Sequence, residues 1–363
     1  MKLPKLYALG KKLPIDLSLS ENPLGCSPRI FAALKSDLKL ITNYPDPRSQ
    51  KLKTALAQNF ALSKENITFG NGSETLIDLV CRVLLKPGDN VLIPEVTFPL
   101  FETATILAGA QPSFTKMNRN LDIDLKMMIA NINKKTKLIF LCNPNNPTGK
   151  ILKDKEIINF VKKVSPLSMI VDEANIEFGG KSVVPALNQL NNLIVLRTFS
   201  KAFGLAGLRI GVLIAREKLI KAVDQIRQPF PLNAFAENAA IIALNDQKFI
   251  KKSRRLMIQE KEFLTRELKK RGFTVYDSQA NNILVKVNRV SPVSKLFIQA
   301  LSKNGVSVVN GSLFRGLDDR FFRLSPRLPK TNRRFLKITD KILEGGEFVC
   351  VKRSSHGKKL LIK

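Results

Sequence analysis

The sequence predicts an α/β protein, in which a large domain with a mainly parallel sheet is accompanied by a smaller α+β domain. Short apolar runs alternate with amphipathic stretches between residues 67 and 214, which is typical of strands and helices that alternate along a chain. Beyond Arg216 the pattern changes to long helical stretches and a few short strands. At 363 residues, the chain is long enough to form two domains.

Six short apolar runs make up the predicted large sheet. They are apolar throughout, which is typical of strands that are buried on both faces in a largely parallel sheet. The runs cover residues 67–69, 91–93, 137–142, 169–171, 193–196 and 210–214. A helix is predicted over 73–86, because Leu76, Ile77 and Val80 fall on one face and Pro87 follows its end.

The C-terminal third predicts the smaller domain. A long helix is expected over 246–271, ending at Gly272. Further helices are expected at 293–302 and 332–343, with strands at 273–276, 283–287, 306–309 and 321–324. We therefore expect an N-terminal segment, 1–40, that joins the small domain, a large domain over 41–240 and a small C-terminal domain over 241–363.

Composition excludes several classes of protein. The only histidine, His356, lies in a polar tail, which argues against Ser-His-Asp hydrolysis and histidine-ligated metal catalysis. The net charge is +30, with a pI near 10.1, and such a field attracts anions of every kind. Without zinc-finger spacing or an RNP-like motif, we do not expect nucleic-acid binding.

No run approaches the ~18 apolar residues of a membrane span, so we expect a cytoplasmic protein.

Polar residues follow three of the predicted strands. They are the segment 143–149, the pair Asp172 and Glu173, and the segment 198–201. Because ligands of open α/β sheets bind at the carboxyl ends of the strands, we expect one shared site. Apolar residues before Asp172 also resemble the magnesium-binding strand of a P-loop ATPase. That alternative needs GxxxxGK[ST], and the stretch 179–182 has Asn175 where the first glycine belongs.

Asp172 and Lys201 each predict unusual chemistry. Desolvation at the end of a buried strand disfavours the charged carboxylate of Asp172 unless a cation meets it, so it is either a capped strand end or the partner of a protonated cofactor nitrogen. Lys201 has small and apolar neighbours, in which a lysine loses its proton more readily and becomes free for Schiff-base chemistry. Two of the candidate sites also have an ordinary structural explanation. Lys201 would then be a surface lysine, and the turn 70–74, which joins a strand to a helix, would be a simple helix N-cap.

Two elements could bind a phosphate. Thr198, Ser200 and Arg209 supply hydroxyls and a fixed charge near Lys201. The turn 70–74 joins a predicted strand to a helix, and the free N–H groups at a helix N-terminus favour an anion.

A lysine for a Schiff base, an aspartate for a pyridinium nitrogen and two phosphate-binding elements are together typical of pyridoxal phosphate enzymes. The sequence resembles the fold-type I, class I/II aminotransferases, and within them the histidinol-phosphate aminotransferases. The resemblance extends over residues 14–345 and rests on six ordered motifs, at 20–25, 44–47, 70–74, 142–149, 171–174 and 196–211. It implies a large α/β domain and a smaller α+β domain.

The resemblance implies roles around the cofactor pyridoxal 5'-phosphate. Lys201 would bind its aldehyde, Asp172 its ring nitrogen and Asn146 its ring hydroxyl oxygen. Phe98 would stack on the ring, and Tyr44 would reach the phosphate of the neighbouring subunit of a homodimer. The phosphate would be held by side chains or backbone of Gly72, Ser73, Glu74, Thr198, Ser200 and Arg209.

The resemblance also implies the substrate contacts. Arg323 would grip the substrate's carboxylate or phosphate, and Asn22 would contribute to substrate binding. One position departs from the family: a tyrosine that contacts the ring oxygen is usual three residues after the aspartate, and this chain has Asn175.

The implied activity is amino transfer between histidinol phosphate, a small anionic donor, and 2-oxoglutarate as the 2-oxo acid acceptor, a step of histidine biosynthesis. Two alternatives remain open. One is a threonine-phosphate decarboxylase or another aminotransferase with the same cofactor shell, and the other is an inactive, basic nucleic-acid-binding protein on this scaffold.

Overall fold

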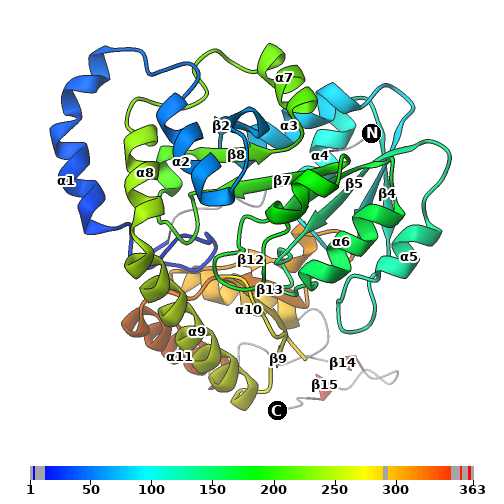
Figure 1. Ribbon diagram of the computed structural model, residues 1–363. Helices are drawn as coiled ribbons and strands as arrows, with labels where there is room; N and C mark the ends of the chain where they lie inside the picture. The colour runs from blue at the N-terminus through cyan, green and yellow to red at the C-terminus, as the bar shows by residue number, and fades with distance from the viewer. Residues whose placement is uncertain (1–2, 5–12, 289–292, 345–351, 354–358, 361–363) are drawn as a thin grey trace.

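The computed structural model describes residues 3–4, 13–288, 293–344, 352–353 and 359–360. A seven-stranded sheet forms the centre of the larger part of the molecule, and a small sheet with three helices lies beside it (Figure 1). No helix in these residues is both long and apolar enough to cross a bilayer.

The large sheet has the order β2-β8-β7-β6-β5-β3-β4. Its strands are β2 (Ile67–Asn71), β3 (Asn90–Pro94), β4 (Gln111–Thr115), β5 (Thr136–Cys142), β6 (Ser168–Asp172), β7 (Leu193–Thr198) and β8 (Ile210–Ile214). The five strands from β7 to β4 pair in parallel, whereas β8 is antiparallel to both β7 and β2. All six expected runs are strands, and the sheet is mainly parallel as predicted.

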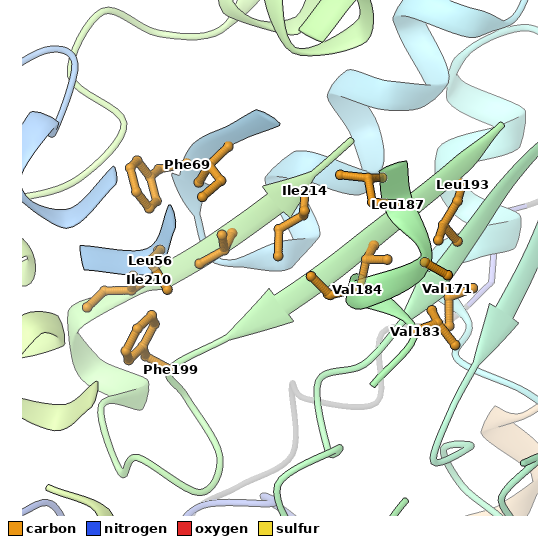
Figure 2. Packing of buried hydrophobic residues seen from close by; sticks show 14 of the residues in the cluster. Leu56, Phe69, Val171, Val183, Val184, Leu187, Leu193, Phe199, Ile210 and Ile214 are labelled. Atoms are coloured by element: carbon orange, nitrogen blue, oxygen red, sulfur yellow. The ribbon is translucent and has the colours of Figure 1, made fainter. Parts of the chain in front are cut away.

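Side chains alternate between two cores because the sheet is covered on both faces. In β5, Ile139 and Leu141 belong to one core while Leu138 and Phe140 belong to the other. Figure 2 shows the first core, where Phe69, Val171 and Ile214 of three strands pack beside side chains from outside the sheet.

Helices cover both faces of the large sheet. Those contributing to the first core include α2 (Gln50–Phe60), α5 (Leu125–Ala130), α6 (Asp154–Lys163) and α8 (Ala236–Asn245). The second core is covered by α3 (Ser73–Leu84), α4 (Leu100–Leu107) and α7 (Glu217–Ile226). Short 3-10 helices are η2 (Leu38–Thr42), η3 (Lys64–Asn66), η4 (Val184–Gln189), η5 (Ala206–Leu208) and η6 (Gly311–Leu313).

The smaller sheet is antiparallel, with the order β12-β13-β10-β9. Its strands are β9 (Thr274–Val275), β10 (Ile283–Lys286), β12 (Val309–Asn310) and β13 (Phe321–Leu324). The helices α9 (Gln247–Lys270), α10 (Val293–Lys303) and α11 (Pro329–Glu344) belong to the same part of the chain. Its core includes Leu264, Phe297, Phe322 and Phe335.

The N-terminal segment contacts both parts. Strand β1 (Ile15–Asp16) pairs in parallel with β11 (Val306–Ser307), beside the small sheet, whereas α1 (Pro28–Ser36) packs on α8. The strand expected over 306–309 is wrong in one respect, because β11 and β12 are separate and pair with different partners. The domain limits at residues 40 and 240 stay a prediction. A last hairpin joins β14 (Lys352–Arg353) and β15 (Lys359–Leu360).

Candidate functional site

A cavity of about 240 Å³ lies where β5, β6 and β7 end, next to the start of α3. Strand β13 of the small sheet supplies part of its wall. Eleven of the predicted site residues line it: Ser73, Glu74, Phe98, Asn146, Asp172, Asn175, Thr198, Ser200, Lys201, Arg209 and Arg323. The strand ends therefore meet at one site, as the sequence predicted.

Asp172 is the last residue of β6 and is 3% exposed. Burial raises the pKa of its carboxyl to about 6, although the N–H of Ala174, 2.9 Å from its Oδ1, and the charge of Lys201 favour the ionised form. A buried carboxylate in this state is stabilised by any cation that enters the cavity.

Lys201 lies three residues beyond the end of β7. Its pKa is lowered to about 8, chiefly because burial disfavours the ammonium and also because Arg323 places a second positive charge nearby. The turn that carries it is held by Thr198, whose hydroxyl oxygen accepts the Ser200 N–H at 3.1 Å. The amine is therefore more available as a nucleophile than that of an exposed lysine.

The start of α3 and the start of β8 meet on the anion-binding side. Gly72, the N-cap of α3, has φ +80° and makes no side-chain cap, and its N–H donates to the Arg209 carbonyl at 2.8 Å. A Cβ at Gly72 would lie 2.3 Å from Nη2 of Arg209, so another residue would be strained by the positive φ and would displace this guanidinium. Arg209 Nη2 lies 3.5 Å from Oε2 of Glu74. The helix N-terminus, the hydroxyls of Thr198 and Ser200 and this guanidinium are groups that could bind a phosphate-like anion.

Arg323 connects three parts of the chain. Its side chain is 2% exposed, its Nη1 donates to Asn146 Oδ1 at 2.9 Å and its Nη2 donates to the carbonyl of Ser18. Because Oδ1 of Asn146 accepts this bond, the Nδ2 group of the same amide is left to donate to another acceptor. The contact with Ser18 could not be predicted, since a backbone carbonyl carries no sequence signal.

Phe98 forms part of the wall and contacts Phe101 edge to face, with ring centroids 5.6 Å apart. Asn175 is 5% exposed, and its Oδ1 has no hydrogen-bond partner among the residues the structure describes. Sequence reasoning missed Leu19 and Glu21, which also line the cavity, although the motif at 20–25 gave a signal for this segment.

Three predicted site residues do not line the cavity: Gly72, which is described above, Asn22 and Tyr44. Asn22 lines a neighbouring groove, and its amide is used internally: Nδ2 donates to the Ala202 carbonyl and to Ser253 Oγ, both at 2.8 Å. Asn22 therefore binds the residue that follows Lys201, and its contribution to substrate binding stays a prediction. Tyr44 is 84% exposed on the outer surface, where its ring stacks on Phe230 with centroids 4.5 Å apart. Its predicted contact with a neighbouring subunit stays a prediction.

The described part of the chain holds no group of three or more His, Cys, Asp or Glu side chains that could bind a metal ion. The alternative of a P-loop ATPase is unsupported. Lys181 is exposed, and Glu173 does not face the cavity: its oxygens bind Ser182 Oγ at 2.6 Å and the Val183 N–H at 2.7 Å.

In this α/β fold, the partly buried Lys201 and the buried Asp172 line one cavity, and comparison with known proteins identifies the family of enzymes to which the chain belongs. Residues 13–338 match the family model described as aminotransferase class I and II. The chain belongs to this family and is an aminotransferase.

Within this family, the chain is similar to proteins that are named histidinol-phosphate aminotransferases. The chain is 36% identical to histidinol-phosphate aminotransferase 2 of Carboxydothermus hydrogenoformans over 90% of this chain and 91% of that protein. It also resembles the crystal structure of the histidinol-phosphate aminotransferase of Clostridium acetobutylicum, with a TM-score of 0.84, 27% identity and coverage of 91% and 99% of the two chains. The Sinorhizobium meliloti enzyme, solved in complex with pyridoxal-5'-phosphate, has the same fold, with a TM-score of 0.86, 24% identity and 92% of each chain covered.

Proposed function

We propose that the protein transfers an amino group between histidinol phosphate and 2-oxoglutarate with pyridoxal 5'-phosphate as cofactor. The observation that carries the proposal is the convergence of Lys201, Asp172 and Arg323 on one cavity next to the α3 N-terminus. The relatives named above support the choice of substrate.

The side chains present fit this cofactor. It supplies an aldehyde and an electron-accepting pyridine ring, which together allow a bond at the substrate's Cα to break. Lys201, with its pKa lowered to about 8, holds the aldehyde covalently and afterwards moves the proton at Cα. Asp172 pairs with the ring nitrogen and keeps it protonated, since a cation there relieves the cost of the buried carboxylate.

The cofactor phosphate is held by the α3 N-terminus together with Thr198, Ser200 and Arg209. The backbone N–H groups of Ser73 and Glu74 lie in the first turn of α3 and are available to an anion. Arg209, whose Nη2 lies 3.5 Å from Oε2 of Glu74, would supply the positive charge for the phosphate. Asn146 and Phe98 also line the cavity, where the Nδ2 of Asn146 would donate to the ring oxygen and Phe98 would cover the ring.

Arg323 holds the anionic group of each substrate. Arg323 and Lys201 line the same cavity of about 240 Å³, so both can act on one small molecule. Histidinol phosphate offers a phosphate to this arginine, and glutamate or 2-oxoglutarate offers a carboxylate. A bidentate pair with either anion fixes the substrate relative to Lys201.

Amino-donor screening of the purified holoenzyme tests the proposal. Histidinol phosphate with 2-oxoglutarate should give glutamate faster than any other donor, and Arg323→Gln should raise the KM of both substrates. Arg320→Gln is the matched control, because Arg320 is exposed and pairs with Asp318 outside the cavity. If no donor gives glutamate, the alternative of an inactive scaffold would be favoured. If threonine phosphate gives carbon dioxide, the alternative of a decarboxylase would be favoured.

We also propose a homodimer, which the surface near Tyr44 supports. Large apolar side chains are exposed there or on neighbouring segments, at Phe31, Leu38, Ile41, Tyr44 and Phe230. Of these, Tyr44 and Phe230 are in contact, and exposed apolar side chains that lie together are typical of interfaces. The cytoplasmic location expected from the sequence stays a prediction.

A further inference from the structure

The loop 277–282, between β9 and β10, reaches from the small sheet to two segments that form the walls of the cavity. Asn282 Nδ2 donates to the carbonyl of Pro147 at 2.7 Å. Asn281 Nδ2 donates to the carbonyl of Ser20 at 2.9 Å. Two neighbouring amides therefore hold two different walls of one site.

Both contacts lie next to residues that face the cavity. Pro147 follows Asn146, which lines the cavity and accepts the hydrogen bond from Arg323. Ser20 is itself a lining residue. Asn281 and Asn282 are at most 1% exposed and do not line the cavity, so they act on it only through these backbone carbonyls.

The loop is itself held rigidly against the large sheet. The N–H of Gln279 donates to the Gly149 carbonyl at 2.7 Å, and a Cβ at Gly149 would lie 2.0 Å from Ser278 Oγ. From behind, Lys261 Nζ donates to the Ser278 carbonyl at 2.7 Å. Because the loop is held in this way, the amide of Asn282 can fix the position of the Pro147 carbonyl.

Stability alone gives a poor explanation for Asn281. Its Oδ1 is buried and has no hydrogen-bond partner among the described residues. An unsatisfied buried acceptor costs free energy, which the hydrogen bond from Nδ2 to the Ser20 carbonyl offsets only in part. We therefore attribute the presence of asparagine at this position to the hydrogen bond between its Nδ2 and the Ser20 carbonyl.

We propose that Asn282 and Asn281 are positioning residues of the amino-transfer site, with Asn282 fixing Asn146 through the Pro147 carbonyl and Asn281 fixing the Ser20 wall. This inference rests on the proposed function. Without the bond from Asn282, the segment that carries Asn146 is free to shift, and the hydrogen bond between Asn146 and Arg323 shifts with it. The cofactor's ring oxygen and the substrate's anion then lose their alignment together.

The test compares Asn282→Ala and Asn282→Asp with Asn288→Ala. Asn288 is the matched control, because it is an exposed residue of the same small sheet region whose Nδ2 also donates to a backbone carbonyl, that of Gly272 at 2.7 Å. We expect kcat to fall on the order of tenfold or more in the Asn282 variants, since small misplacements of reacting groups are costly. The Asp variant keeps the size of the side chain but loses the donor, so it should be no better than Ala.

A second readout does not depend on activity. The visible absorption of the bound cofactor reports the contact with its ring oxygen, so its maximum or its pH titration should shift in the Asn282 variants and stay unchanged in Asn288→Ala. Asn281→Ala, which alters the other wall, should raise the KM of the substrates more than it lowers kcat. It also keeps the proposal testable if the Asn282 variants do not fold.

A lower melting temperature with unchanged kcat, KM and absorption in both Asn281→Ala and Asn282→Ala would overturn the inference, because it would show a merely structural role. A wild-type holoenzyme that transfers no amino group would instead contradict the proposed function. In that case the absorption and the cofactor affinity of the variants still decide whether Asn282 positions Asn146.

Discussion

Two ionisable groups that line the cavity have pKa values displaced toward neutrality, Lys201 to about 8 and Asp172 to about 6. Burial is the main cause for both, and it acts in opposite directions on an amine and a carboxyl. Such displacement is typical of groups that react or bind a charged cofactor. Both shifts agree with what the sequence predicted from small or apolar neighbours.

Lys201→Ala should abolish the visible absorption of the bound cofactor without unfolding the protein. The reason is that Lys201 is the only lysine lining the cavity in the described part of the chain. Absorption spectra and circular dichroism measure the two properties. Lys181→Ala, at an exposed position, is the control and should keep the spectrum. An alanine variant at 201 whose absorption survives and is fixed to the chain by borohydride would contradict the assignment.

Asp172→Asn should change the pH dependence of the apoprotein's stability. The folded-state pKa of about 6 lies above the ordinary value of 3.8, so Asp172 stabilises the fold below about pH 4 and this contribution is lost as the pH rises through 6. Asparagine stays neutral, so the variant should gain stability relative to wild type between pH 4 and 7, by about 3 kcal/mol at most.

Urea unfolding of both apoproteins at several pH values measures this difference. A difference that does not change with pH would show that Asp172 titrates normally. The same variant should bind the cofactor more weakly, because a neutral amide does not favour a protonated ring nitrogen.

At the scale of single elements, strands and helices with strong apolar patterns were predictable. Strands β5, β6 and β7 and helix α3 are found where the runs and the helical spacing indicated. Strand β4 was missed because Gln111–Thr115 is a partly exposed edge strand that contains Pro112 and has no apolar run. The antiparallel pairing of β8 with β7 could not be predicted either, because a fully buried strand has the same apolar pattern in either direction.

Contacts between distant elements were the least predictable part of the site. Arg323 was identified through a resemblance, but nothing in the sequence indicated that it binds Ser18 and Asn146 at once. The loop with Asn281 and Asn282 resembles an ordinary polar turn. Its role depends on backbone carbonyls of segments more than a hundred residues away along the chain.

The junction of α3 with β8 gives a prediction at this scale. Gly72→Ala should weaken cofactor binding by roughly tenfold or more, which corresponds to about 1.4 kcal/mol. The new Cβ would lie 2.3 Å from Nη2 of Arg209 and displace this guanidinium from the anion site. Titration of the apoprotein with pyridoxal phosphate gives the affinity.

Gly88→Ala is the control for backbone strain. Gly88 has a φ of +90°, close to the +80° of Gly72, but a Cβ there meets nothing within 4 Å. Both variants should lose stability, whereas only the Gly72 variant should bind the cofactor less tightly. Equal affinities in the two variants would mean that Arg209 does not hold the phosphate.

At the scale of the whole molecule, the two sheets and the N-terminal segment enclose the site jointly. The large sheet supplies Asp172 and leads into the turn with Lys201, the small sheet supplies Arg323, and the segment around Ser20 supplies a third wall. None of the three parts contains a complete site. The exposed apolar side chains near Tyr44 suggest that a second copy covers this surface.

Tyr44→Phe should therefore weaken cofactor retention without disturbing the dimer. The phenylalanine keeps the stacking on Phe230, which lies 4.5 Å away between ring centroids, and loses only the hydroxyl that we expect to reach the partner's phosphate site. Sedimentation measures the oligomeric state, and dialysis followed by absorption measures retention. A fully active wild-type monomer would rule out a shared site.

The most direct test is a single half-reaction of the holoenzyme with histidinol phosphate in the absence of any 2-oxo acid. Histidinol phosphate has no α-carboxylate to lose, so the bond to hydrogen at Cα is the one that breaks, and Lys201 moves the proton. We expect the absorption of the aldehyde form of the cofactor to be replaced by that of its amine form, and 2-oxoglutarate to restore the original spectrum with release of glutamate. An unchanged spectrum with histidinol phosphate, together with carbon dioxide from threonine phosphate, would contradict the proposed function.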